Sequence, residues 1–181
     1  MTGGEEAAQL ARELVGELAA RGTTVACAES LTGGRLVAAL TSVPGSSAVV
    51  RGAVVAYSSD IKVQLLGVDP EVLAAQGPVC AEVAAQMALG ARNGLGATYA
   101  VSTTGEAGPE SASGQPVGTV LVAVCGPSGT TTRELDLLHG GREEIQVGAV
   151  DGALRLLADV VAHGSPADHR GPDSPDGNIE A

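Results

Sequence analysis

The chain has 181 residues, a length that fits one domain, and a hydrophobic content of 44% that can supply a sizeable core. It has 26 glycines, two tyrosines and neither Phe nor Trp, so that core must consist of closely packed Ala, Val and Leu. The formal net charge of −11 argues against a nucleic-acid-binding protein, which would normally carry a basic face.

Helical and strand-like hydrophobic patterns alternate along the chain. The predicted elements, in chain order, are a helix with an apolar stripe from Ala7 to Leu18, a strand at Thr23–Cys27, a helix at about Gly34–Leu40, a strand-rich stretch at Ala48–Tyr57, short helices at Asp60–Leu66 and Pro70–Ala75, a longer helix from Val83 that closes near Gly94 or Gly96, strands at Tyr99–Thr103, Gly118–Cys125 and Thr130–Leu138, and a helix with a stripe from Ile145 to Val160. This order predicts an α/β fold, a three-layer α/β/α sandwich around a mixed sheet in a single domain.

The segment 164–181 differs in composition from the rest of the chain. Its four acidic residues, one arginine and three prolines predict disorder, so the domain is expected to span residues 1–163. No apolar run approaches the ~20 residues of a membrane span, and the N-terminus has no signal-peptide pattern. We therefore expect a cytoplasmic protein with reduced thiols and no membrane partner.

Neither the cysteines nor the histidines form a recognisable site. Cys27, Cys80 and Cys125 are far apart and lack the spacing of metal ligands. Cys27 and Cys125 fall in strand patterns and are expected in the core, whereas a thiol at a helix start, as at Cys80, can be reactive. The histidines, at positions 139, 163 and 169, are dispersed toward the C-terminus, which argues against a histidine-based catalytic centre.

Ser30 lies between an apolar strand pattern and a helical pattern that begins near Arg35. A serine at a strand-to-helix turn lies beside free backbone N–H groups, which stabilise negative charge on a neighbouring oxygen. Acyl-transfer enzymes need this pairing of a nucleophile with oxyanion donors. The alternative interpretation is that Ser30 or Thr32 only caps the helix.

Tyr57 ends the next apolar strand pattern, and Lys62 follows five residues later. A buried lysine has its pKa lowered by desolvation and can then accept a proton from a serine hydroxyl. Serine–lysine pairs are an established alternative to serine–histidine pairs. The alternative interpretation makes Tyr57 a half-buried residue at a strand end and Lys62 a solvated charge on a helix.

A glycine-rich loop follows the strand predicted at Tyr99–Thr103, in the run from Thr104 to Pro109. Backbone N–H groups in such loops can hold a phosphate or an oxyanion. The run does not match a Walker A loop, which would require Gly-Lys-Ser/Thr at its end.

Taken together, these stretches resemble the C-terminal domain of the competence/damage-inducible CinA proteins, a family that includes stand-alone nicotinamide-nucleotide amidases. The resemblance runs from about Glu5 to Val161. It is carried by the ordered matches Ala28-Glu29-Ser30-Leu31-Thr32-Gly33-Gly34, Pro44-Gly45-Ser46-Ser47, Val55-Ala56-Tyr57-Ser58 with Lys62, Leu66-Gly67-Val68, Thr104-Gly105 with Ala107-Gly108-Pro109, Pro116-Val117-Gly118-Thr119-Val120, and Gly141-Arg142.

The resemblance implies an amidohydrolase, or NMN deamidase, that removes ammonia from the carboxamide of nicotinamide mononucleotide (NMN) and needs no metal or cofactor. It assigns the nucleophile to Ser30, assisted by Tyr57 and Lys62. We expect a neutral Lys62, directly or relayed through Tyr57, to accept the serine proton. The expected substrate contacts, with the oxyanion donors placed at residues 32–34, are Thr32, Gly33, Gly34, Ser46, Ser47, Thr104, Gly105, Ala107, Gly108 and Arg142.

The chain departs from the family pattern at positions where a phosphate or ribose would be expected. An apolar loop residue is replaced by Glu106, whose carboxylate would repel a phosphate unless it points away or pairs with Arg142. The other departures are Glu110-Ser111-Ala112 for Gly-Gly, Gln115 for a lysine, Cys80-Ala81 for a serine–glutamate pair, and Gln146 for an arginine. The sequence therefore supports amide hydrolysis more strongly than it supports NMN as the substrate.

Two other functions remain open at this point. The chain could be a non-catalytic nucleotide-binding or regulatory module that retains the fold. It could also be an interaction subunit, since larger family members join this domain to an N-terminal pyrophosphatase-like domain. The expected partner is a small-molecule pyridine nucleotide, and the resemblance also suggests a homo-oligomer.

Overall fold

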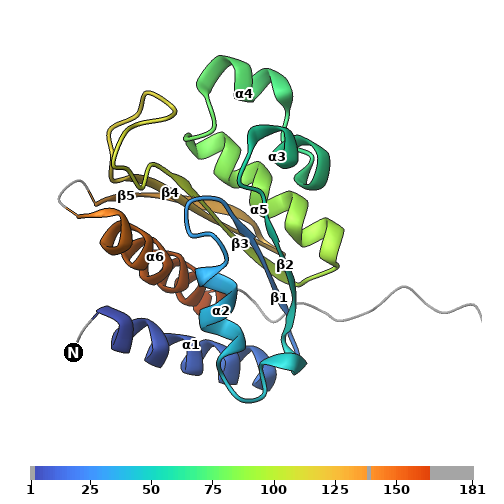
Figure 1. Ribbon diagram of the computed structural model, residues 1–181. Helices are drawn as coiled ribbons and strands as arrows, with labels where there is room; N and C mark the ends of the chain where they lie inside the picture. Colours follow the sequence, from blue (N-terminus) through green and yellow to red (C-terminus); the bar gives the residue numbers. More distant parts are fainter. Residues whose placement is uncertain (1–2, 138–139, 164–181) are drawn as a thin grey trace, which may run out of the picture.

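The computed structural model describes residues 3–137 and 140–163. Within them the chain forms, in order, α1 (Gly3–Ala20), β1 (Val25–Glu29), α2 (Arg35–Thr41), the 3-10 turn η1 (Ser46–Ala48), β2 (Val50–Val55), α3 (Ser59–Leu66), α4 (Pro70–Gln76), α5 (Ala81–Leu95), β3 (Tyr99–Gly105), β4 (Thr119–Gly126), β5 (Gly129–Asp136) and α6 (Arg142–His163) (Figure 1). Every predicted helix and strand is present, with shifted ends. Leu138, the histidines at 139 and 169, and the segment 164–181 lie outside the described residues, so the predicted disorder stays a prediction.

The strands form one mixed sheet in the order β2-β1-β3-β4-β5. β1 pairs in parallel with both β2 and β3, whereas β4 is antiparallel to β3 and to β5. The central strands β1, β3 and β4 are almost entirely buried, which agrees with their small or apolar residues and with the cover on both faces of the sheet; the polar residues of β1 and β3 lie at the ends of these strands that face the cavity. β5 is the exposed edge strand, and its sequence is polar throughout most of its length.

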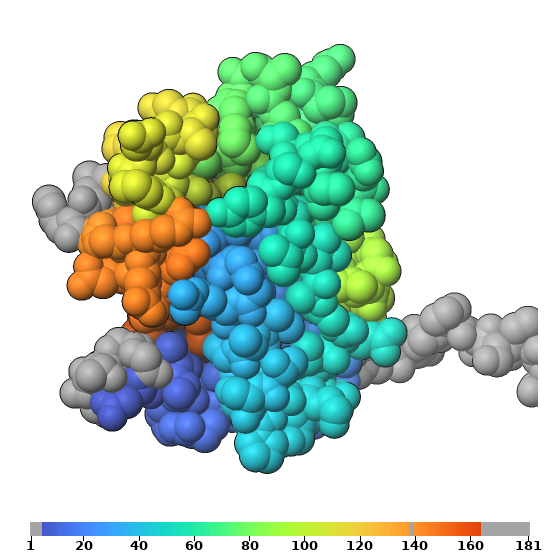
Figure 2. Space-filling model, viewed as in Figure 1, coloured from blue at the N-terminus to red at the C-terminus, as the bar shows by residue number. Residues whose placement is uncertain are grey.

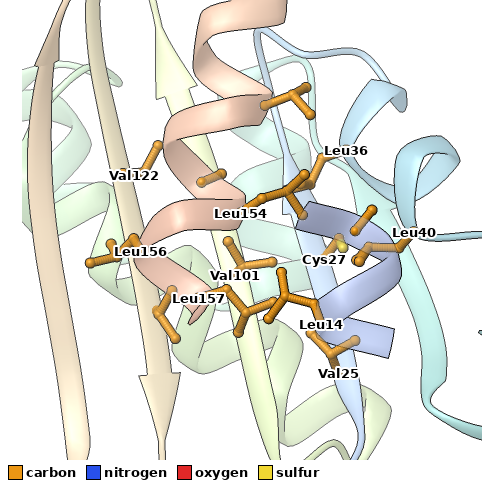
Figure 3. Close-up of a cluster of buried hydrophobic side chains, with 14 of the residues drawn as sticks. Leu14, Val25, Cys27, Leu36, Leu40, Val101, Val122, Leu154, Leu156 and Leu157 are labelled. Atoms are coloured by element: carbon orange, nitrogen blue, oxygen red, sulfur yellow. The ribbon is translucent and has the colours of Figure 1, made fainter. Parts of the chain in front are cut away.

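Helices cover both faces of the sheet, which confirms the predicted α/β sandwich. α1, α2 and α6 lie on one face, and α3, α4 and α5 lie on the other (Figure 1). Figure 3 shows the larger core, where leucines of α1, α2 and α6 pack against strand residues that include Cys27. Cys27 and Cys125 are both buried, as predicted. None of the described helices is long and apolar enough to cross a bilayer.

The connections around β1 determine where a site can form. The chain passes from β1 to β2 through α2 on one face, and from β2 to β3 through α3, α4 and α5 on the other. The strand order therefore reverses at β1, and ligands of open α/β sheets bind at such a point, beyond the carboxyl ends of the strands. Ser30 follows β1, Tyr57 follows β2 and Glu106 follows β3, so all three motifs leave the sheet at this edge.

Candidate active site

Ser30 and Lys62 are in direct contact. The Lys62 Nζ atom lies 2.9 Å from Ser30 Oγ and 2.7 Å from the carbonyl oxygen of Ala56. Ser30 is held at the end of β1, where its backbone N–H donates to the carbonyl of Thr103 on β3. Lys62 lies in the first turns of α3, which begins just after β2, and so its side chain reaches back across the ends of the strands. A serine hydroxyl in contact with a lysine amine is an arrangement that can support nucleophilic catalysis.

Burial favours the neutral form of the Lys62 amine. Only 1% of the Lys62 surface is exposed, and both hydrogen bonds go to uncharged oxygens. Removal of the ammonium from water disfavours its charged form and lowers the pKa of Lys62 from 10.5 to about 8. A lysine with this pKa is partly neutral near neutral pH and can act as a general base.

Tyr57 does not lie between the serine and the lysine. Its side chain is 61% exposed, and its hydroxyl accepts a hydrogen bond of 2.9 Å from Arg142 Nη2. The other guanidinium nitrogen of Arg142, Nη1, donates to the carbonyl of Gly108 at 2.6 Å. Arg142 therefore connects the segment after β2 with the loop after β3. A relay through Tyr57 is not required, because Lys62 touches Ser30 directly.

These groups border one cavity of about 340 Å³, large enough for a small-molecule ligand. Figure 2 shows the loop after β3 (yellow), the segment after β2 (blue-green) and the start of α6 (orange) meeting on one face of the protein. The expected site residues that line this cavity are Ser30, Tyr57, Lys62, Thr104, Gly105, Ala107, Gly108 and Arg142.

The N-terminus of α2 is occupied by a carboxylate of the chain itself. Glu29 is fully buried, and its Oε2 accepts from Thr32 Oγ1 (2.7 Å) and from the backbone N–H groups of Gly34 (2.9 Å) and Leu36 (3.1 Å). Its Oε1 accepts from the N–H of Val37 at 2.8 Å. A negative charge is favourable here because unpaired N–H groups and the helix dipole converge on it.

This arrangement corrects the expectation for residues 32–34. The N–H of Gly34 is bound to Glu29 and that of Gly33 to the carbonyl of Ser30, so neither is free for a substrate oxyanion. Thr32 is buried and does not line the cavity. Leu31 does line it, and within the described chain its N–H has no acceptor. The sequence signal that could have identified Glu29 is an acidic residue just after an apolar strand pattern and a few residues before the start of a helix.

Ser46 and Ser47 lie away from this cavity. They form η1 just before β2, beside the residues that begin β1, whereas Ser30 follows the opposite end of β1. A strand rises about 3.3 Å per residue, so the length of β1 separates the two ends. Ser46 Oγ instead donates to the carbonyl of Thr41, which is the local backbone role of a turn serine. The expected contact of these serines with the same site is therefore not met within one chain.

Glu106 is turned into its own loop rather than toward Arg142. Its carboxylate accepts from the N–H groups of Ser113 (2.6 Å) and Ala112 (3.2 Å). This pairing holds the loop that forms one wall of the cavity. Gly108 in the same loop has φ +77°, and a Cβ there would come within 2.7 Å of Val117, so the backbone path requires glycine.

The described residues offer no metal-binding cluster of three or more His, Cys, Asp or Glu side chains. Cys80 caps α5, since its Sγ accepts from the N–H of Val83 at 3.5 Å, as expected for a helix start.

Comparisons with known proteins agree with this architecture. Residues 7–161 match the family described as the CinA C-terminal domain. A CinA-like protein of Frankia casuarinae is 47% identical over 149 residues, which cover 82% of this chain and 34% of the relative. One of Mycobacterium tuberculosis is 47% identical over 146 residues, covering 80% and 34%. The chain thus spans about a third of the length of these relatives.

Solved structures resemble the whole domain. The competence/damage-inducible protein CihA of Agrobacterium tumefaciens superposes with a TM-score of 0.83 at 39% identity, covering 86% of this chain and 95% of that one. The competence damage-inducible protein A of Klebsiella pneumoniae superposes with a TM-score of 0.84 at 34% identity, covering 88% and 99%. From its sequence match and its fold, the chain belongs to the CinA C-terminal domain family.

Proposed function

We propose that the protein is an amidohydrolase that releases ammonia from the carboxamide of NMN and leaves nicotinic acid mononucleotide. The observation that carries this proposal is the 2.9 Å contact between a buried Lys62 amine and the Ser30 hydroxyl at the end of β1. A buried amine with a pKa of about 8 is not a solvated surface charge, and its pKa is close to that of a general base that accepts a proton near neutral pH.

The proposed reaction has two halves. In the first, neutral Lys62 accepts the Ser30 proton while Ser30 Oγ bonds to the carboxamide carbon. The carbonyl oxygen becomes an oxyanion, and the donor that we propose for it is the N–H of Leu31, the residue that follows the nucleophile and lines the cavity. The C–N bond then breaks, and the leaving nitrogen takes the proton from Lys62 and departs as ammonia. In the second half, Lys62 accepts a proton from a water molecule whose oxygen attacks the acyl carbon; the ester bond to Ser30 then breaks, Ser30 Oγ takes the proton from Lys62, and the acid is released.

Arg142 supports an anionic substrate. Among the described residues that line the cavity, the basic side chains are Lys62 and Arg142, and the Lys62 amine is in contact with Ser30, which leaves Arg142 to bind an anion. Arginine binds phosphate strongly because its N–H groups form paired, charge-assisted hydrogen bonds. Glu106 is less of an obstacle to a phosphate than its sequence position suggested, because two backbone N–H groups already bind its carboxylate.

The test is ammonia release from NMN, nicotinamide riboside, nicotinamide and NAD, with wild type and Ser30→Ala side by side. We expect wild type to act on NMN and Ser30→Ala to lose activity by ~10³-fold or more. The remote exposed serine at the end of α2 supplies a matched control, Ser42→Ala, which should keep full activity. Near-normal turnover by Ser30→Ala would eliminate the serine mechanism. Pyridine-nucleotide binding without ammonia release by wild type would identify a non-catalytic binding module instead.

A further inference from the structure

The backbone turn after Ser30 is held by a contact from the other end of the chain. Gln146, near the start of α6, donates a hydrogen bond of 2.7 Å from Nε2 to the carbonyl oxygen of Leu31. The preceding carbonyl, that of Ser30, accepts from the N–H of Gly33 at 3.1 Å. The two peptide groups that flank Leu31 are therefore each fixed through their carbonyl oxygen.

Fixing these carbonyls also fixes the donors on the opposite side of the turn. In a trans peptide group the N–H of one residue points away from the C=O of the residue before it, so the bond to the Ser30 carbonyl orients the Leu31 N–H, and the bond from Gln146 to the Leu31 carbonyl orients the next peptide group, which carries the Thr32 N–H. The Leu31 N–H belongs to the residue that follows the proposed nucleophile, and it has no acceptor within residues 3–137 and 140–163. Because Leu31 lines the cavity beside Ser30, this N–H is in the part of the turn where an oxyanion would form.

We propose that Gln146 is a positioning residue for this oxyanion donor. Its amide holds the peptide group that follows Leu31, next to the peptide group that carries the Leu31 N–H, and so keeps the turn after Ser30 in one conformation, with the Leu31 N–H available to the reacting oxygen. Gln146 does not itself line the cavity and is half-buried against the turn. The start of α6 (orange), on which Gln146 lies, adjoins the segment of α2 (light blue) in Figure 2. This inference rests on the serine mechanism proposed above.

The role has a specific kinetic signature. An oxyanion exists only in the tetrahedral state, so a donor that binds it affects kcat rather than ground-state affinity. Loss of a residue that orients a catalytic group typically lowers activity by about 10- to 100-fold. A residue that served only for packing would instead change the stability and leave the acylation rate of the folded enzyme unchanged.

Three substitutions of Gln146 separate these roles. Gln146→Met keeps the length and removes the donor, Gln146→Glu keeps the shape and places a carboxylate against the carbonyl, and Gln146→Arg retains N–H donors. The matched control is Gln9→Met, the same change at an exposed glutamine of α1. Each purified protein is assayed for kcat and KM with NMN and for thermal unfolding.

The same proteins are assayed for acylation of Ser30 by p-nitrophenyl acetate, followed by mass spectrometry of the Ser30 peptide. In this step Ser30 Oγ bonds to the acetyl carbon, the aryl ester bond breaks, nitrophenolate leaves, and the serine proton passes to Lys62. The ester requires no recognition of a nucleotide, so it tests the oxyanion donor separately from the substrate.

We expect Gln146→Met and Gln146→Glu to lower kcat and the acylation rate by about 10- to 100-fold with KM nearly unchanged, and Gln146→Arg to restore most of the rate. Wild-type acylation rates in Gln146→Met and Gln146→Glu, or equal losses in all three variants, would overturn the inference. If wild type is acylated but releases no ammonia from NMN, the proposed substrate is wrong and the acylation rates still decide the role of Gln146. If wild type is not acylated at Ser30, the proposed mechanism and this inference both fail.

Discussion

The amine nitrogen of Lys62 lies 2.9 Å from the hydroxyl oxygen of Ser30, although 32 positions separate the two residues in the chain. The parallel pairing of β1 with β2 makes this contact possible, because it brings the ends of both strands to the same edge of the sheet. The amine is buried and has no charged partner, so the pair depends on the protonation state of Lys62.

The first prediction concerns the pH dependence of activity. If neutral Lys62 is the base, kcat/KM for NMN should rise about tenfold per pH unit below the pKa of Lys62, near 8, and level off above it. Ammonia release measured from about pH 6 to about pH 10 checks this. Lys62→Arg is the control, because an arginine side chain stays charged throughout and should be inactive at every pH. A flat profile would contradict the assignment of the base.

The second prediction concerns stability, since the burial of the Lys62 amine costs folding free energy. The folded state lowers the pKa of Lys62 from 10.5 to about 8, a difference worth on the order of 3 kcal/mol. Below pH 8 the lysine is protonated in both states and the full cost is present. Between pH 8 and 10.5 the unfolded state binds more protons than the folded state, so the cost declines as the pH rises.

Lys62→Met should therefore be more stable than wild type at neutral pH, and its advantage should shrink as the pH rises from about 8 to 10.5. The free energies of unfolding of the two proteins in urea, compared at several pH values, measure this. Other groups titrate equally in both proteins and cancel in the difference. An advantage that grew with pH would show that burial does not lower the pKa of Lys62. The same variant should lose ammonia release.

The third prediction concerns Glu29, whose carboxylate accepts four hydrogen bonds at the start of α2. Glu29→Gln replaces one acceptor oxygen by an NH₂ group that faces N–H donors and also removes the charge. We expect a loss of roughly 2–4 kcal/mol of stability, measured by urea unfolding. Activity should fall as well, because the same helix start adjoins the Ser30 turn. An unchanged midpoint would show that neither the charge of Glu29 nor its second acceptor oxygen contributes to stability.

The fourth prediction concerns Arg142, which lines the cavity and contacts Tyr57 and Gly108. If its guanidinium binds the substrate phosphate, Arg142→Ala should raise KM for NMN by roughly 10- to 100-fold and affect nicotinamide riboside much less. Stability should change little, because Arg142 is exposed. Arg12→Ala, at an exposed arginine of α1, is the matched control. Equal losses for both substrates would indicate that Arg142 orders the cavity wall rather than binding phosphate.

Glu106, one of the departures from the family pattern, has hydrogen-bond partners that the sequence alone could not predict. Glu106 was expected either to point away from a phosphate or to pair with Arg142, and the sequence could not choose between the two. In the structure the Glu106 carboxylate accepts from the N–H groups of Ala112 and Ser113, which follow it by six and seven positions in the chain. They were not predictable because they depend on how an irregular loop closes, which no hydrophobic period encodes.

The sequence by itself determined the helices and strands, their layering and the mixed sheet, because hydrophobic period and turn residues act locally along the chain. It also marked Ser30 and Lys62 as candidates through their positions after predicted strands. Only the tertiary structure decided that these two side chains touch, that Glu29 rather than a ligand occupies the start of α2, and that Ser46 and Ser47 lie at the other end of β1. These contacts depend on which strands are neighbours in the sheet and on which face each helix packs. Both are decided by packing between segments that are distant in the sequence.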